Sequence, residues 1–125
     1  RALMEVQTAL NAWQRRQFDY GDADCCQFAA FIVKEMTGKD YISQFEYASE
    51  AQAEVLIKQE GKLSDLVGTV LGKPSDDLKD GDPCVVDLPV IGQVCGIKYQ
   101  ESVVCLTIKG MKQIPDRYLI HGWSV

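Results

Sequence analysis

The segment that decides the fold reads Tyr20-Gly21-Asp22-Ala23-Asp24-Cys25-Cys26, and a stretch with helical periodicity follows it directly. Asp24 is a residue type that caps helix N-termini well, and Gln27 three residues later completes a capping-box pattern. The apolar stripe of this helix comprises Cys25, Phe28, Ala29, Ile32, Val33 and Met36. Because Gly38 stands where a C-terminal cap belongs, we expect the helix to end there. The sequence therefore predicts a helix that begins with two adjacent cysteines.

Helical patterns also occur on both sides of this helix. Upstream, apolar residues recur at spacings of three and four, which predicts a first helix. Its stripe comprises Leu3, Val6, Leu10 and Trp13. Downstream, Ser49 with Gln52 predicts the start of a third helix, and Gly61 predicts its end. A short fourth helix carries the apolar residues Leu63, Leu66, Val67, Val70 and Leu71. Gly72 and Pro74 are expected to stop it.

From Pro83 onward the pattern changes to short runs rich in β-branched residues, which predict strands. We expect strands over residues 84–88, 94–99, 103–108, 111–114 and 118–123. The polar turn Gln100-Glu101-Ser102 predicts a hairpin between the second and third of them. Helices followed by an antiparallel sheet are typical of the α+β class. No linker interrupts the pattern, so we expect one domain over residues 1–125.

Composition and charge argue against several classes of protein. The 125 residues are 46% hydrophobic and 25% charged, as in globular domains and unlike disordered chains. The net charge of −5 argues against a nucleic-acid partner, which would need a basic face. No apolar run reaches the roughly 18 residues of a membrane span, and residues 1–13 lack the apolar core of a secretory signal. The acidic stretch from Asp76 to Asp82 lacks the ligand spacing of a calcium loop and is interpreted as a solvated loop.

The unusual feature of the composition is a set of five cysteines, at positions 25, 26, 84, 95 and 105. An odd number with one adjacent pair is a poor disulfide framework, so we expect reduced thiols in a reducing compartment. A zinc site with His121 would need closely spaced cysteine pairs, and redox catalysis would need Cys-x-x-Cys. Neither pattern is present, so we predict no metal and no cofactor. Cys95 and Cys105, on adjacent predicted strands, are interpreted as packed thiols.

Cys25 is the residue with the clearest chemical potential. A cysteine in the first turn of a helix faces unpaired N–H groups and the positive end of the helix dipole, and both favour the thiolate. Because Cys25 begins the apolar stripe, its sulfur should point toward the sheet, where a base on a strand could reach it. Cys26 points about 100° away around the helix and is interpreted as a packing residue. On spacing alone, Cys25 as a small buried apolar residue remains an alternative.

The order of the motifs along the chain resembles that of a known family. The motifs are Phe18-x-Tyr20-Gly21-x-x-Asp24-Cys25-x-x-Phe28, then Gly81-Asp82 at a strand start, then Gly96-Ile97 in the next strand. This series is similar to that of the papain-like cell-wall peptidases of the NlpC kind. It is more similar still to small tailed-bacteriophage proteins related to them. Further matches to those phage proteins are Trp13, Thr37-Gly38 and the run from Tyr47-Ala48-Ser49 to Gly61.

This resemblance implies a papain-like α+β fold, in which N-terminal helices pack on a C-terminal antiparallel sheet. It also implies that Cys25 occupies the position of the nucleophile. The family's base is a histidine on the second strand, but that position is Val94 here, and the residue that would orient it falls near Leu106. The only histidine of the chain is His121, in the terminal segment. Since valine cannot accept a proton, we predict that the catalytic dyad is broken.

The resemblance therefore implies a structural or assembly protein of a phage tail tip, a pseudoenzyme on a cysteine-peptidase scaffold. Its expected partners are other tail proteins, with peptidoglycan as a further ligand. Its expected location is the virion tail, after assembly in the bacterial host cytoplasm with reduced thiols. Two alternatives stay open, because fold alone does not establish function. One is an active murein-degrading peptidase with Cys25 as nucleophile and His121 as a relocated base. The other is a domain that binds a peptide in the cleft without cutting it.

Overall fold

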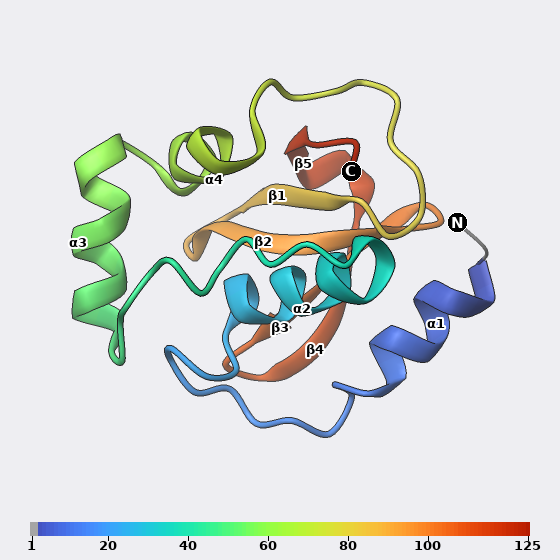
Figure 1. Ribbon diagram of the computed structural model, residues 1–125, viewed down its shortest axis with the longest axis horizontal. Helices are drawn as coiled ribbons and strands as arrows, with labels where there is room; N and C mark the ends of the chain where they lie inside the picture. Colours follow the sequence, from blue (N-terminus) through green and yellow to red (C-terminus); the bar gives the residue numbers. More distant parts are fainter. Residues whose placement is uncertain (1–2) are drawn as a thin grey trace.

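Four helices precede five strands along the chain in the computed structural model, which describes residues 3–125 (Figure 1). The helices are α1 (Leu3–Asn11), α2 (Cys25–Thr37), α3 (Glu50–Glu60) and α4 (Leu63–Leu71). The strands are β1 (Pro83–Leu88), β2 (Gly92–Tyr99), β3 (Ser102–Thr107), β4 (Gly110–Pro115) and β5 (Leu119–Gly122), with the 3₁₀ helix η1 (Asp116–Tyr118) before β5. This order confirms the predicted α+β class. No helix in the described range is long and apolar enough to cross a membrane. Arg1 and Ala2, part of the segment inspected for a signal sequence, lie outside the described residues.

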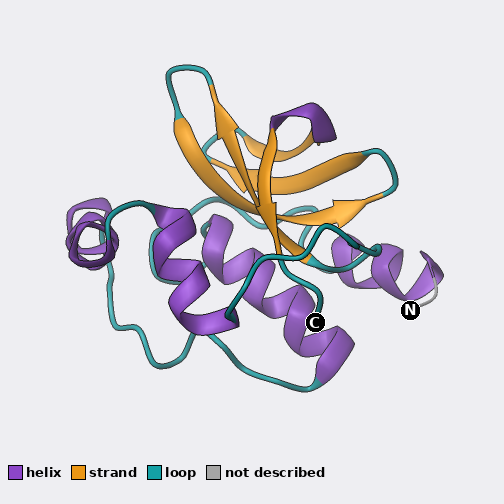
Figure 2. Ribbon diagram, turned by 90° about the horizontal axis from the view of Figure 1, so that it is seen from above, coloured by secondary structure: helices purple, strands orange, loops and turns teal. Residues whose placement is uncertain are grey.

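The strands form one antiparallel sheet in the order β4-β3-β2-β1-β5. Its two edge strands are joined by the three residues of η1 alone. In a flat sheet the edges would lie about 19 Å apart, because neighbouring strands are spaced by about 4.8 Å. The chain from Pro115 to Leu119 spans at most about 14 Å. The sheet must therefore curl, and Figure 2 shows it strongly curved, with the four α-helices gathered on one side.

Alternation along the strands gives the sheet two buried faces. The face toward the helices carries Val85, Cys95, Ile97, Val104 and Leu106. The other face carries Cys84, Val86, Val94, Val103 and Cys105. Phe28 and Ile32 of α2 pack in one core with the first face, whereas the curl brings Tyr118 and Leu119 over the second. Cys95 and Cys105, which lie on adjacent strands, therefore belong to different cores.

Trp13 lies beyond the end of α1, although the apolar stripe predicted a helix that includes it. The helix ends at Asn11, and the Trp13 N–H donates to the Leu10 carbonyl at 3.1 Å, a tighter bond to the third preceding residue. The Trp13 side chain is nevertheless buried and packs on Phe28 and Phe31 of α2. The stripe was right about burial and wrong about the helix end.

The C-terminal segment ties the sheet to the middle of the chain. Trp123 is 1% exposed, and its indole N–H donates to the Gly72 carbonyl at 2.9 Å. Asp82 is equally buried and accepts hydrogen bonds from the backbone N–H groups of Lys79 and Val125, at 2.8 and 3.2 Å. The interpretation of the acidic stretch as a solvated loop is therefore wrong for Asp82, because its carboxylate holds the turn before β1 against the C-terminal segment.

Candidate functional site

Asp24 fixes the start of α2, as its place in the sequence predicts. Its Oδ1 atom accepts the N-cap hydrogen bond from the Gln27 N–H at 2.8 Å. Its Oδ2 atom accepts two more, from the Gly21 N–H at 2.9 Å and from the Tyr47 hydroxyl at 2.7 Å. The residue is 3% exposed. One buried carboxylate thus joins the preceding loop, the helix and the segment before α3, and it sets where Cys25 lies.

Gly21 allows this loop to come close to the rest of the site. Its φ of 85° lies in the region that favours glycine. A Cβ atom at this position would collide with the carbonyl oxygen of Tyr47. Glycine is therefore required at position 21 for a structural reason. It lets the backbone lie against the Tyr47 carbonyl while the Gly21 N–H donates to Asp24.

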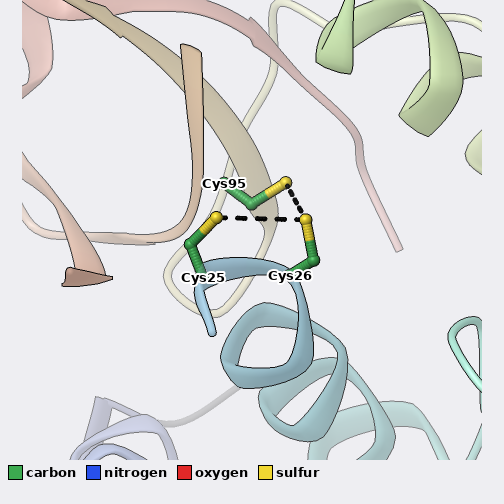
Figure 3. A group of neighbouring side chains, drawn as sticks. All are labelled: Cys25, Cys26 and Cys95. Carbon is green, nitrogen blue, oxygen red and sulfur yellow. Dashed lines mark hydrogen bonds between the residues drawn. The ribbon is translucent and has the colours of Figure 1, made fainter. Parts of the chain in front are cut away.

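Three thiols meet where α2 begins and β2 passes beneath it. Cys25 and Cys26 are the first two residues of α2, and Cys95 comes from the helix-facing side of β2. The Sγ atoms of Cys25 and Cys26 are 3.9 Å apart, and the Cys26 thiol donates to the Cys95 sulfur at 3.4 Å. Figure 3 shows the three sulfurs pointing toward one another. Within residues 3–125, these three sulfurs form a group close enough to hold one metal ion, all within 4.8 Å of one another. We call these three residues the thiol trio.

Hydrogen bonds within the thiol trio favour a thiolate on Cys25. When Cys25 is ionised, the Cys26 and Cys95 thiols can turn their S–H groups toward it, and these hydrogen bonds hold the pKa of Cys25 well below its usual range, although burial acts in the opposite direction. The hydrogen bond to Cys25 is the main cause that raises the pKa of Cys26 and of Cys95, and burial adds to it. The helix N-terminus also favours an anion at this position. The metal-free trio therefore holds its first negative charge on Cys25.

Cys95 is the site residue that the sequence analysis missed. Val94, which the resemblance aligned with the family's histidine, belongs to the core on the opposite face of the sheet, although it also lines the cleft described below. The residue of β2 that faces the start of α2 is Cys95, and Leu106 on β3 is helix-facing as well. The signal that could have found Cys95 is strand alternation, which sends Val94 and Cys95 to opposite faces.

The structure does not bring His121 and Cys25 together. The strand register places His121 opposite Val85, and Val85 opposite Cys95. With strands about 4.8 Å apart, the Cα atoms of His121 and Cys95 are about 10 Å apart, and the buried Val85 occupies the row between them. His121 is exposed and lines a small pocket beside α4, whereas Cys25 lines the cleft described next.

The thiol trio lies in a cleft of about 330 Å³ between the helices and the sheet. Apolar and aromatic residues that line it include Tyr41, Phe45, Ile57, Val67 and Leu71. Two further lining residues are largely exposed, namely Ile91 in the β1–β2 turn (69%) and Ile108 in the β3–β4 turn (76%). A concave apolar site with a few convergent polar groups is the usual form of a ligand-binding site.

Fold and site together define an α+β protein with a thiol-lined apolar cleft. The chain belongs to the DUF6950 family, described as a domain of unknown function, whose family model matches residues 3–125. The comparison with curated proteins found no match. Membership of this family assigns no activity, so a functional inference must come from the site and from the resemblance of the motifs.

Proposed function

We propose that the protein is a structural or assembly component of a bacteriophage tail tip, built on an NlpC-type papain-like scaffold that has lost catalysis. The phage-tail part rests on the resemblance of the motif series. The observation that carries the loss of catalysis is the wall opposite the start of α2, which presents Cys95 and Leu106. A leucine cannot accept a proton, and a buried thiol is a poor general base for a second thiol.

The packing of α2 supports the scaffold part of the proposal. α2 packs against β2 and β3, with Cys25 in its first turn. A cysteine at the N-terminus of a helix that lies on an antiparallel sheet is what the papain-like resemblance implies. Under this proposal Cys25 keeps the nucleophile's position, whereas Val94 and Leu106 stand where the resemblance places its partners. Cys95 is the residue of β2 that meets the start of α2.

The β1–β2 turn supports an assembly role. Val90 is fully exposed and has a φ of 70°, where a β-branched residue is strained. The Ile91 N–H donates to the Pro89 carbonyl at 2.8 Å, which closes the rare, strained form of γ-turn around Val90. Strain and exposed apolar side chains concentrate at contact sites, because a partner that buries them offsets their cost. The turn is therefore the surface that we assign to a neighbouring tail protein.

One observation favours the alternative of an active murein peptidase, namely the lowered pKa of Cys25. This alternative needs a general acid for the leaving amine. The only histidine of the chain is His121, which lies across β1 from the trio. An active enzyme would therefore have to rearrange its sheet or take a proton donor from another source.

Virion composition tests the assembly role. We expect the protein in purified virions of its phage, and we expect the double variant Val90→Asp/Ile91→Asp to be missing from them. Aspartate tolerates positive φ better than valine, so the variant should fold at least as well as wild type. The matched control is Met4→Glu/Val55→Glu, which places two charges on exposed apolar residues of α1 and α3 and should still be incorporated. Virions without the wild-type protein would refute the assembly role.

Hydrolysis of peptidoglycan tests the loss of catalysis. Purified, reduced protein should release no soluble fragments from sacculi, and Cys25→Ala should behave like wild type. Fragment release by wild type that Cys25→Ala abolishes would overturn the pseudoenzyme proposal in favour of the peptidase. A dependence of that release on His121 would identify the relocated base.

A further inference from the structure

We propose that Cys25, Cys26 and Cys95 form a binding site for a thiophilic divalent metal ion of the Zn²⁺ type, with the fourth coordination position open toward the cleft. The proposal concerns the chemistry of the cleft and does not depend on a role in a phage tail. Thiolates are the ligands that select Zn²⁺ and related soft ions over Mg²⁺ and Ca²⁺.

The spacing of the sulfurs matches that of a metal–thiolate site. In a tetrahedral zinc site with Zn–S bonds of about 2.3 Å, two sulfurs lie about 3.8 Å apart. In this protein the distances are 3.9 Å for Cys25–Cys26 and 3.4 Å for Cys26–Cys95, and no pair exceeds 4.8 Å. Side-chain adjustments of less than about 1 Å therefore suffice for all three sulfurs to reach one ion.

A disulfide explains the thiol trio less well than a metal ion does. An S–S bond is about 2.05 Å long, and adjacent cysteines such as Cys25 and Cys26 rarely meet its geometry. A bond between Cys26 and Cys95 would use two of the three sulfurs and leave Cys25 without a role. A metal ion gives all three sulfurs one common role.

The surroundings of the thiol trio also favour a cation. Two of the ligands lie on the first turn of α2, whose N–H groups stabilise negative charge on the sulfurs. Three buried thiolates would repel one another without a counter-charge, and a divalent ion supplies it. When the ion binds, the thiols release their protons to solvent, and three metal–sulfur bonds replace the weak thiol–thiol hydrogen bonds.

The fourth position distinguishes this site from a closed structural zinc site. Three protein ligands plus an open position are typical of sites that bind a water molecule or an exogenous ligand. Cys25 and Cys26 line the cleft and are only half-buried, so a ligand in the cleft can reach the ion. A Cys25 sulfur that holds metal is also unavailable as a nucleophile, in agreement with the broken dyad.

Titration with Cd²⁺ tests the site directly. The full chain is reduced with a phosphine, freed of metal with a chelator and titrated while the ultraviolet charge-transfer absorption of cadmium thiolates is recorded. We expect saturation at one Cd²⁺ per chain, with an intensity that corresponds to three thiolates. Zn²⁺ should displace Cd²⁺ and should raise the melting temperature. Co²⁺ should give the intense visible bands of a four-coordinate site.

Variants on both faces of the sheet make the test specific. Cys95→Ser and Cys25→Ser should each weaken Cd²⁺ binding by at least about 100-fold, because loss of a direct ligand exceeds the 10–100-fold effect of outer-shell changes. The matched control is Cys105→Ala, on the opposite face, which should bind within about twofold of wild type. Cys25 is only half-buried, so Cys25→Ser keeps the test valid should Cys95→Ser fail to fold.

Four outcomes would overturn the metal site. One is the absence of charge-transfer absorption at stoichiometric Cd²⁺. The second is a loss of binding in Cys105→Ala as large as that in Cys95→Ser, and the third is full binding in Cys25→Ser. The fourth is a Cys26–Cys95 disulfide in freshly isolated protein. None of these bears on incorporation into virions, so failure of the metal site and failure of the tail-tip proposal can be told apart.

Discussion

Two groups of thiols lie on opposite faces of the same curled sheet. On the helix-facing side, Cys95 meets Cys25 and Cys26 in an open cleft. On the other side, Cys84 and Cys105 belong to an apolar cluster and are at most 1% exposed, although Cys84 also lines the cleft and Cys25 packs against this cluster. Cys84 and Cys95 are close in sequence and belong to paired strands. Both residues are cysteines on neighbouring strands, and what separates them is the face of the sheet on which each side chain lies.

The electrostatic consequences follow from this separation. Burial raises the pKa of Cys84 to about 12, with the nearby Asp82 adding to the effect. Burial also raises the pKa of Cys105. In the trio, hydrogen bonds from the neighbouring thiols lower the pKa of Cys25. Burial thus keeps Cys84 and Cys105 protonated, whereas hydrogen bonds from neighbouring thiols at the start of α2 favour the thiolate of Cys25.

Alkylation should show the largest difference between the two groups. In metal-free, reduced, native protein, iodoacetamide should modify Cys25 first. It should modify Cys84 and Cys105 at least about 1,000-fold more slowly, because their thiolate fraction near neutral pH is negligible. Since the pKa of Cys25 is lowered, its rate should reach its plateau at a lower pH than the rate of an unperturbed cysteine thiol, whose pKa is about 8.5. Peptide mapping by mass spectrometry measures each rate, and equal rates at Cys25 and Cys105 would contradict the comparison.

Removing the carboxylate that positions the trio should have the next largest effect. Asp24→Ala leaves three donors without their acceptor, and we expect it to lower the free energy of unfolding by about 3 kcal/mol. The control is Ser49→Ala at the N-cap of α3, where a single bond to the Gln52 N–H at 3.2 Å predicts a loss of about 1 kcal/mol or less. Urea denaturation measures both free energies of unfolding. Equal losses in the two variants would show that Asp24 contributes only the stability of a single N-cap hydrogen bond.

Serine substitution should distinguish the two groups by stability. Cys105→Ser buries a hydroxyl among apolar side chains, and we expect a loss of about 2 kcal/mol. Cys26→Ser lies in a half-buried, polar group where the hydroxyl can still donate to Cys95, and we expect a loss below about 1 kcal/mol. Thermal unfolding in the absence of metal measures the difference. A larger loss of stability in Cys26→Ser than in Cys105→Ser would contradict the comparison, because it would mean that the cleft is the more tightly packed of the two sites.

The smallest effect is expected for His121→Ala. His121 is exposed and lies across β1 from the trio, so its removal should leave the pH profile of Cys25 alkylation unchanged. A shift of that profile toward higher pH would mean that His121 assists ionisation of Cys25. That result would revive the peptidase alternative.

Much of the fold could be predicted from local signals. The caps at Asp24 and Gly38 act within a few residues, and both are confirmed, the latter with a φ of 78°. The strands were predicted to within two residues because β-branched runs and turn residues alternate clearly in the C-terminal half. The end of α1 was not predicted, because Trp13 remains buried after the chain leaves the helix. Burial depends on tertiary packing, so the periodicity of apolar residues does not determine whether a buried residue is helical.

The candidate site was predicted only in part, for the same reason. The position of Cys25 follows from the N-cap, which is local. The role of Cys95 depends on which face of β2 meets α2, and alternation alone leaves that choice open. Gly96 carries the missing information, because a Cβ there would come within 2.6 Å of the Cys105 sulfur. The outer face is too crowded at that point for a side chain, but this crowding is visible only once the strands are paired.

The hydrogen bond from the Trp123 indole to the Gly72 carbonyl has a consequence for how the protein unfolds. It connects residues 51 positions apart and joins the end of α4 to the segment after β5. Neither the helical layer nor the sheet can bury its own apolar face without the other, so we expect one cooperative transition with no half-folded state. Trp13 reports the contact between α1 and α2, and Trp123 reports closure of the sheet on α4. The two tryptophans are thus internal fluorophores at opposite ends of one folding unit, and their emission should change together.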